Sequence, residues 1–282
     1  MSAATFAAAQ LLRVLPRSRI TRAVGRLVDA RLHPKISAAI VSAYAKLYRV
    51  ALEEAAEQEG PFESFDDFFT RKLRDGLRPL CPDENAVVSP ADGRIEDIGP
   101  ITEGGRLTIK GRDYSVADLV GDPAEVKRYA GGQFVIVYLS PRDYHRVHSP
   151  VSGEVSLIRS LPGDLYPVNA IGERHVPSLF SRNRRVAIVI DTKTHARVTV
   201  VMVSAMIVGR VSVSVIDARD VPLGTHRIDP PRPVTRGEEI GIFRLGSTAV
   251  VFVEKGAAPP WTRKPGQVLY GEPLTSDVEP KR

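Results

Sequence analysis

Short runs of β-branched and other apolar residues, separated by clusters of Gly, Pro and Asn, constrain the fold of this chain most. Each run is long enough for a strand and short for a helix, and turn residues mark its ends. We therefore expect an α+β protein whose main part is an antiparallel β sandwich or barrel. The expected strands are 134–139, 186–190, 198–208, 211–216 and 249–253.

Two segments repeat one pattern in this β-rich part. The first is Ser89-Pro90-x-x-Gly93-x-Ile95, and the second is Ser149-Pro150-x-x-Gly153-x-Val155. A third segment, 235–241, has the Gly-rich composition of a tight turn. Together they favour a core built from related half-motifs, similar to the barrel-sandwich hybrids of biotinyl carriers.

The first 50 residues differ from the rest of the chain in charge. They hold nine Lys or Arg residues and a single acid, Asp29, whereas the whole 282-residue chain has a net charge of +6. Apolar residues recur at helical spacing and basic residues occupy the opposite faces. The first stripe is Ile20, Val24, Leu27 and Val28, opposite Arg19, Arg22 and Arg26; the second is Ile36, Ile40, Tyr44 and Leu47, opposite Lys35, Lys46 and Arg49.

Two basic amphipathic helices, separated by Pro34, are therefore expected here. They fit an anchor on an anionic membrane surface, where each Lys or Arg contributes about 1 kcal/mol. Helices that simply pack on the core by their apolar stripes are the alternative. Nucleic acid is disfavoured because basic residues are not interleaved with aromatic ones. We expect residues 1–60 to form a membrane-association segment and residues 61–282 a β-rich domain.

Nothing in the sequence predicts a transmembrane span or a signal peptide. The single cysteine, Cys81, excludes an intramolecular disulfide and fits a reducing compartment. We expect a peripheral protein on the cytoplasmic face of the cell membrane.

The dipeptide Gly246-Ser247, within Leu245-Gly246-Ser247-Thr248, is a place where a serine could attack its own backbone. Gly246 has no Cβ, so its carbonyl carbon is open and its backbone can adopt a strained turn. An N-to-O acyl shift would give an ester, and elimination and hydrolysis would leave a pyruvoyl group on a new chain, residues 247–282. Because Gly-Ser is also a common turn dipeptide, this chemistry needs support from elsewhere in the chain.

A serine nucleophile requires a base, and the base requires an orienting acid. Asp92 lies in Ser89-Pro90-Ala91-Asp92-Gly93-Arg94-Ile95, ahead of an expected strand. His145 and His148 lie in Ser140-Pro141-Arg142-Asp143-Tyr144-His145-Arg146-Val147-His148-Ser149-Pro150, after another. The chain thus contains candidates for both roles.

These three segments, in this order, resemble the phosphatidylserine decarboxylases, self-cleaving pyruvoyl enzymes of phospholipid synthesis. The resemblance extends from the N-terminal helices nearly to the C-terminus. One stretch departs from it: Tyr166-Pro167 stands where some members have an aromatic residue followed by serine, so no hydroxyl role is carried over. The other matching segments are Phe68-Phe69-Thr70-Arg71-Lys72-Leu73-Arg74, Arg78-Pro79, Pro162-Gly163-Asp164-Leu165 and Val168-Asn169.

The resemblance implies specific roles. Asp92, His148 and Ser247 would form the self-cleavage triad, with the cut between Gly246 and Ser247, and His145 would serve the decarboxylation. The cofactor would be a pyruvoyl group made from Ser247, which forms a Schiff base with phosphatidylserine before phosphatidylethanolamine and CO2 are released. The family also implies a homo-oligomer, a dimer of cleaved pairs, and no metal.

Three other functions remain open from the residues alone. A carrier module would need a hairpin lysine, and a serine hydrolase would favour a Gly-x-Ser-x-Gly elbow; neither pattern stands out. A zinc site at His145, His148 and Asp92 would lack a fourth ligand, and His33, His175, His195 and His226 are more typical of surface or packing positions. Arg182, Arg184 and Arg185 could meet a phosphate or form a solvated turn.

Overall fold

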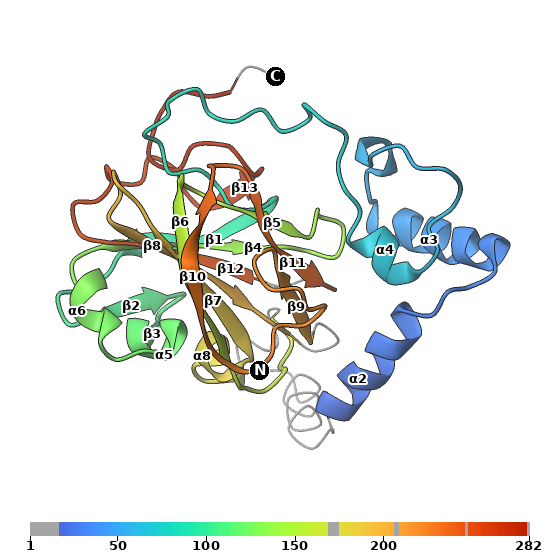
Figure 1. The fold of residues 1–282 in the computed structure, drawn as a ribbon, viewed down its shortest axis with the longest axis horizontal. Helices are drawn as coiled ribbons and strands as arrows, with labels where there is room; N and C mark the ends of the chain where they lie inside the picture. The colour runs from blue at the N-terminus through green and yellow to red at the C-terminus, as the bar shows by residue number, and fades with distance from the viewer. Residues whose placement is uncertain (1–16, 169–174, 206–208, 246–247, 281–282) are drawn as a thin grey trace.

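Eight strands form one large sheet in the computed structural model, which describes residues 17–168, 175–205, 209–245 and 248–280 (Figure 1). All neighbouring strands in it are antiparallel. In spatial order they are β10 (Gly224–Val234), β6 (Gly153–Leu161), β7 (Arg185–Asp191), β8 (Arg197–Val203), β12 (Thr248–Val253), β4 (Gln133–Tyr138), β1 (Gly93–Pro100) and β13 (Gly266–Val268).

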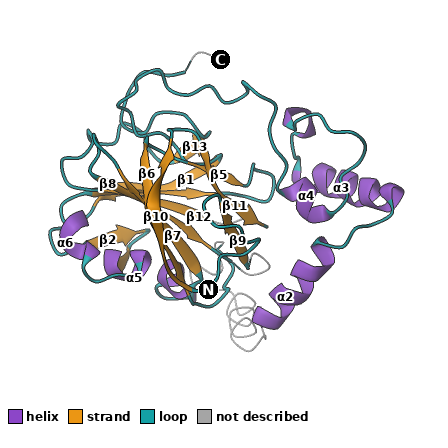
Figure 2. Ribbon diagram, in the orientation of Figure 1, coloured by secondary structure: helices purple, strands orange, loops and turns teal. Residues whose placement is uncertain are grey.

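A three-stranded sheet and several short helices complete the architecture (Figure 2). The small sheet has the order β5 (Arg146–His148), β11 (Glu239–Arg244), β9 (Arg210–Val213), and a hairpin joins β2 (Arg106–Ile109) to β3 (Arg112–Ser115). The helices are α2 (Arg17–Val28), α3 (Pro34–Tyr48), α4 (Phe65–Phe69), α5 (Val116–Val120), α6 (Glu125–Tyr129) and α8 (Leu179–Arg182), with a 3-10 turn at Leu52–Glu54.

Alternating side chains in the central strands divide the hydrophobic core in two. In β12, Val250 and Phe252 pack in a cluster that includes residues of α3, α4, α5 and α8, whereas Ala249 and Val251 face the other way. The second cluster also contains Val147, Phe243 and other residues of the small sheet. Because successive residues of a strand point to opposite faces, each strand of this kind needs apolar residues at every position.

The expected α+β class and mainly antiparallel sheet are confirmed. All five expected strands are present, although the third ends at Val203 and the fourth at Val213. Within the described ranges the large sheet is open, with β10 and β13 at its edges, so a closed barrel is not confirmed. Whether a sheet closes into a barrel depends on pairing between strands distant in sequence, and the local periodicity of the sequence does not predict that pairing.

The two repeated segments have the same local structure. The hydroxyl of Ser89 donates to the Ala91 carbonyl at 2.8 Å, and that of Ser149 donates to the Val151 carbonyl at 2.6 Å. Each turn leads into a glycine that starts a strand, Gly93 in β1 and Gly153 in β6. A Cβ at either glycine would collide with a backbone carbonyl of the neighbouring strand. The sequence repeat thus marks two equivalent strand entries.

The N-terminal helices lie beside the sheets (Figure 1). Pro34 occupies the first turn of α3, where its missing N–H removes no hydrogen bond. Val24 and Val28 of α2 pack against the core, yet other members of the expected apolar stripes face solvent. Leu27 is 68% exposed, Ile36 54%, Ile40 41% and Leu47 74%. No helix of the described part is long and apolar enough to cross a membrane.

Gly93→Ala is expected to lower the free energy of unfolding by about 1–3 kcal/mol, because the added methyl meets the rigid carbonyl of Tyr138. Gly99→Ala in the same strand is the matched control, since its Cβ would lie 3.7 Å from the Phe134 ring, an ordinary contact. Urea unfolding of both variants measures this. Equal midpoints for the two variants would show that strand entry tolerates a side chain.

Candidate functional site

Backbone pairing brings the three motif segments together. The amide of Phe243 in β11 donates to the carbonyl of His145 at 2.9 Å, and the amide of His148 in β5 donates to the carbonyl of Pro90 at 2.7 Å. β11 ends at Arg244, directly before Leu245. The turn that contains Asp92, the strand that contains His148 and the chain entering the Gly-Ser dipeptide are therefore neighbours.

Gly246 and Ser247 lie outside the described residues, but the residues on both sides of them are informative. Leu245 has φ +87°, a conformation that is strained for a residue with a branched side chain. Thr248 opens β12, between Tyr138 of β4 and Val203 of β8. Its hydroxyl is buried and has no hydrogen-bond partner within the described ranges. The dipeptide thus follows a strained residue and precedes an unsatisfied polar one.

Three neighbours hold the ring of His148. Its Nδ1 lies 2.8 Å from the carbonyl oxygen of Gly237, its Nε2 lies 3.2 Å from the hydroxyl of Tyr144, and its plane stacks on Tyr270 with ring centres 3.9 Å apart. Because a carbonyl only accepts, this geometry assigns the proton of a neutral ring to Nδ1. Burial lowers the pKa of His148, and the bond to Gly237 only partly opposes this. The ring is a neutral base with its lone pair on Nε2.

Asp92 is connected to His148 through Tyr270. One carboxylate oxygen accepts from Arg78 Nε and Nη2 at 3.0 and 2.7 Å, and the other accepts from the backbone amide of Tyr270 at 2.9 Å. Arg78 also binds Glu54 at 2.6 Å. Burial raises the pKa of the Asp92 carboxyl despite the bonds from Arg78. Asp92 fixes the position of Tyr270, whose ring in turn covers His148.

His145 has a very different environment. Its side chain is fully buried, its ring centre lies 4.0 Å from that of Phe69, and neither ring nitrogen has a hydrogen-bond partner among the described residues. Burial, with a contribution from the nearby positive charge of Arg71, lowers the pKa of His145 to about 3. The ring is therefore neutral, since the contact with the Asp143 backbone opposes this lowering of the pKa only in part.

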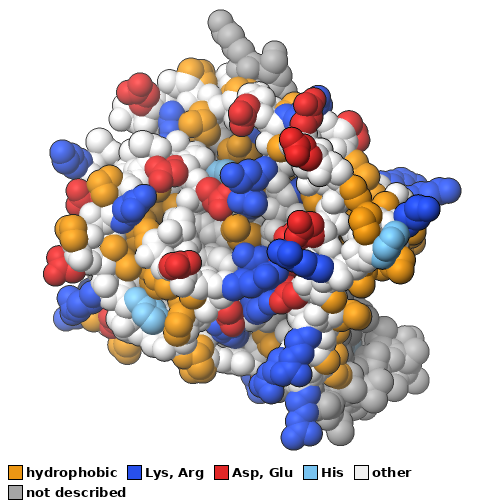
Figure 3. Space-filling model, turned by 45° about the vertical axis from the view of Figure 1, so that its right-hand side comes forward, with side chains coloured by type: hydrophobic (Ala, Val, Ile, Leu, Met, Phe, Trp, Pro, Cys, Tyr) orange, Lys and Arg blue, Asp and Glu red, His pale blue; other side chains and the backbone are white. Residues whose placement is uncertain are grey.

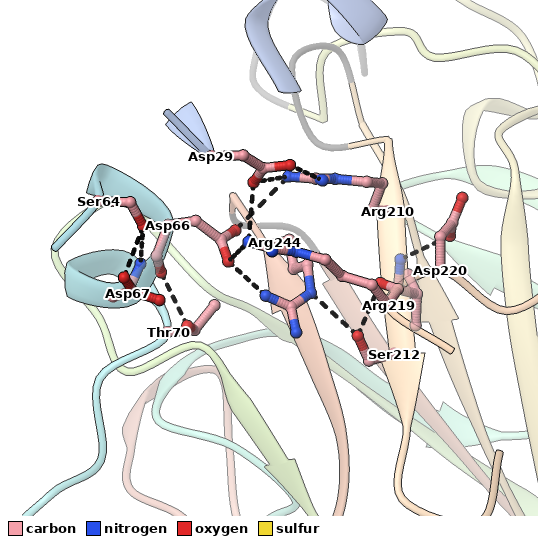
Figure 4. A network of polar contacts seen from close by, with 11 residues as sticks. Asp29, Ser64, Asp66, Asp67, Thr70, Arg210, Ser212, Arg219, Asp220 and Arg244 are labelled. Atoms are coloured by element: carbon pink, nitrogen blue, oxygen red, sulfur yellow. Dashed lines mark hydrogen bonds and ion pairs between the residues drawn. The ribbon is translucent and has the colours of Figure 1, made fainter. Parts of the chain in front are cut away.

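A network of ion pairs ties the N-terminal helices to the end of β11 (Figure 4). Asp66 of α4 is fully buried and binds Arg244, the last residue of β11, and Arg219 at 2.8 Å. Asp29, next to α2, binds Arg210 of β9 at 2.5 and 2.7 Å and Arg219 at 2.9 Å. The position of Leu245 therefore depends on helices far away in the sequence.

A cavity of about 570 Å³ opens beside Leu245. Its walls are α2, the residues Pro162, Gly163 and Leu165 of a sequence motif, and the ends of β9 and β11. Gly209 permits the close approach of α2, since a Cβ there would lie 2.5 Å from the Thr21 methyl. The cavity thus lies against Leu245, the residue that precedes the Gly-Ser dipeptide in the sequence.

The arginine cluster at 182–185 is mostly structural. Arg184 binds Asp220 at 2.7 Å, and Arg185 donates to the backbone carbonyls of Leu119, Ser181 and Asn183. The interpretation as a solvated turn is wrong for Arg185, which is buried because its guanidinium satisfies carbonyl groups at the ends of short helices.

Several residues of the site have no clear sequence signal. Tyr270 lies 178 positions from Asp92, and only the fold shows that its ring stacks on His148. The tight turn at 235–241 is visible in the sequence, but the bond from its Gly237 carbonyl to a histidine is not. Within the described part of the chain, no group of three or more His, Cys, Asp or Glu residues is placed to hold a metal.

Comparisons with known proteins agree on one family. The model of the phosphatidylserine decarboxylase family matches residues 65–275. A phosphatidylserine decarboxylase proenzyme of Anaeromyxobacter sp. (strain K) is 39% identical over 93% of this chain and 95% of its own. Those of Shewanella pealeana and Psychrobacter cryohalolentis are 37% and 38% identical, over 86% and 89% of this chain and 88% and 90% of their own. The chain belongs to the phosphatidylserine decarboxylase family.

Proposed function

We propose that this chain cuts itself between Gly246 and Ser247 and then decarboxylates phosphatidylserine to phosphatidylethanolamine, with the pyruvoyl group derived from Ser247 as its cofactor. The observation that carries the proposal is the convergence of the His148 strand, the Asp92 turn and the strained end of β11. The relatives' printed name, phosphatidylserine decarboxylase proenzyme, supports both a cut and this substrate.

Self-cleavage uses His148 as the base. Its Nε2 lone pair takes the proton of the Ser247 hydroxyl, whose oxygen attacks the Gly246 carbonyl carbon, and the C–N bond breaks to give an ester and a free amine. Loss of the α proton then eliminates the Gly246 carboxylate and leaves dehydroalanine. Addition of water and release of ammonia give the pyruvoyl group.

Two side chains of the motif segments have buried polar atoms that a carbonyl group or a substrate could bind. The Thr248 hydroxyl and both nitrogens of His145 lack partners among the described residues, so they are available to a carbonyl and to a substrate. When present, the pyruvoyl group supplies an electron-withdrawing carbonyl that accepts the electron pair released with CO2. The chain's own residues must exclude water and place a proton.

His145 is the proposed proton donor to the substrate carbon. In the absence of substrate, burial keeps its ring neutral. The carboxylate of an incoming serine headgroup would favour the charged ring, because a neighbouring negative charge raises the pKa of an imidazole. The ammonium group of the headgroup releases protons when it condenses with a carbonyl, and one taken up by His145 can be passed to the substrate carbon after CO2 departs. Protonation there, and not on the cofactor, keeps the cofactor intact.

Residues 1–60 are proposed to bind an anionic membrane surface, with residues 61–282 as the catalytic domain. Hydrophobic and basic side chains gather on the side of the molecule where the helices lie (Figure 3). Leu27 and Leu47 are among the most exposed apolar side chains, and basic residues of the same helices flank them. This combination fits peripheral attachment on the cytoplasmic face. The dimer implied by family resemblance stays a prediction.

Ser247→Ala is expected to remain one chain without decarboxylase activity, because it removes both the nucleophile and the cofactor's source. His148→Ala and Asp92→Ala should stay largely uncleaved, with rates lower by roughly 10³-fold or more, since His148 is the base and Asp92 holds Tyr270, which stacks on it. Intact mass spectrometry measures the fraction cleaved. Two fragments from Ser247→Ala would refute the cleavage site.

His145→Ala is expected to cleave normally, because His145 is not the base for Ser247, yet to turn over about 10²–10⁴-fold more slowly for lack of a placed acid. Intact masses confirm the two chains, and CO2 release from phosphatidylserine gives the rate. If His145→Ala failed to cleave while His148→Ala cleaved, the two histidines would have the reverse of the proposed roles. Near-normal turnover would assign the proton to another group.

Leu27→Ser combined with Leu47→Ser should weaken binding to vesicles containing anionic lipid by about tenfold or more, since each leucine loses the gain of leaving water. High salt should weaken binding of the unchanged chain as well. Val278→Ser, at a residue that is 50% exposed and outside the helices, is the control. Equal flotation of all three proteins with vesicles would contradict a membrane role for these helices.

A further inference from the structure

The cavity beside Leu245 has an unusual charge distribution. Five arginines line it, Arg22 and Arg26 from α2 and Arg184, Arg210 and Arg244 from the β-rich part, against two acids, Asp29 and Asp220. Whether it attracts an anion depends on which arginines already have acidic partners.

Three of the five arginines are already paired. Arg210 makes two bonds to Asp29, at 2.5 and 2.7 Å, Arg184 binds Asp220 at 2.7 Å, and Arg244 binds the buried Asp66. Arg210 and its neighbours also lower the pKa of Asp29, which therefore stays ionised. Bidentate and buried pairs of this kind leave little charge for a ligand. Figure 4 shows Asp29 beside the guanidinium group of Arg210 and Asp66 beside that of Arg244.

Arg22 and Arg26 differ from the other three. Both are exposed, they are four residues apart and so lie one above the other on α2, and neither has an ion pair with an acid of the described residues. Asp29, which continues the same face of the helix, is turned to Arg210. The uncompensated charge of the cavity therefore resides on these two side chains.

The helix that carries them is held firmly at this rim. The Thr21 side chain lies against Gly209, Arg210 packs beside Gly25, and the Asp29–Arg210 pair fixes the C-terminal end. The neighbouring Leu27 points to solvent. One side of α2 thus faces the cavity with two guanidinium groups, and another presents an apolar side chain outward.

We propose that Arg22 and Arg26 form a subsite for the phosphodiester of a phospholipid headgroup. The inference rests on the proposed function, for which it names the groups that recognise the anion. Guanidinium groups match phosphate oxygens in geometry and charge. In a phosphatidylserine molecule the phosphate lies between the acyl chains and the serine. A cationic pair that lines the same cavity as Leu245 and lies beside the outward-facing Leu27 fits that order.

The test uses dihexanoyl phosphatidylserine below its micellar concentration, so that membrane binding plays no part. Arg22→Ala combined with Arg26→Ala should cleave itself normally and raise KM about tenfold or more, as expected for losing charged hydrogen bonds, with a small change in kcat. Arg22→Lys combined with Arg26→Lys should recover part of the lost affinity, because lysine keeps the positive charge but not the planar guanidinium group.

Arg227→Ala combined with Arg232→Ala is the matched control. It removes the same charge from exposed positions on the edge strand β10, away from the cavity lining. This variant should keep the KM of the unchanged enzyme. Equal KM values for the two alanine pairs would overturn the subsite.

Competition by inorganic phosphate shows whether the arginine pair binds a lipid headgroup or free phosphate. We expect it to compete with the short-chain lipid in the unchanged enzyme and to compete less in the Arg22→Ala, Arg26→Ala variant. Phosphate inhibition that depends on this pair while the KM for lipid does not would mean that the pair binds free phosphate only, and would overturn the headgroup assignment. Absence of any turnover in the cleaved, unchanged enzyme would instead refute the proposed function.

Discussion

The site depends on the antiparallel pairing of β11 with β5. Gly241 pairs with Val147 and Ile242 pairs with Arg146 in this ladder. The amide of Phe243 then donates a hydrogen bond to the carbonyl of His145. The register decides which residues of β5 face the end of β11, since a shift of one residue would turn every side chain to the opposite face. On its other side β11 pairs with β9, whose Arg210 connects to α2. The small sheet therefore links the histidines, the Gly-Ser dipeptide and the N-terminal helices.

Two histidines three residues apart have separate properties because their neighbours differ. His148 has partners at both ring nitrogens and stacks on Tyr270, which fixes its tautomer, and its Nε2 lone pair, which faces the Tyr144 hydroxyl, is the one that can take up a proton. His145 packs against Phe69 and has no such partner among the described residues, so its protonation depends on what else enters the site. Desolvation keeps both rings neutral in the absence of a ligand. The neighbours of each ring, and not its sequence position, thus separate the two proposed roles.

Local patterns predict the strands because the core is built from them. The run 249–253 is apolar at every position, and the structure buries both of its faces. Periodicity also finds the apolar stripe of α3, but it does not reveal that Ile36 and Leu47 face solvent. Whether a stripe is covered depends on what packs over it, and that is a property of the whole fold.

The candidate site is only partly readable from the sequence for the same reason. The motifs supply Asp92, His145 and His148, whose adjacency follows from pairing between strands distant in sequence. A direct carboxylate–imidazole contact is the simplest expectation for a triad. In the structure Asp92 binds Arg78 and the backbone of Tyr270, while a carbonyl orients the histidine. A sequence motif names side chains only, so it does not predict hydrogen bonds made by backbone groups.

The state of His148 in the uncleaved protein tests the mechanism most directly. Nitrogen NMR of histidine-labelled Ser247→Ala, with His148→Gln in the same background to assign the signal, reports both the pKa and the tautomer. The structure predicts a ring that stays neutral as the pH falls through 6.5, because its pKa is lowered, and that carries its proton on Nδ1 toward Gly237. A pKa at or above 6.5, or a proton on Nε2, would contradict the assignment of His148 as the base that activates Ser247.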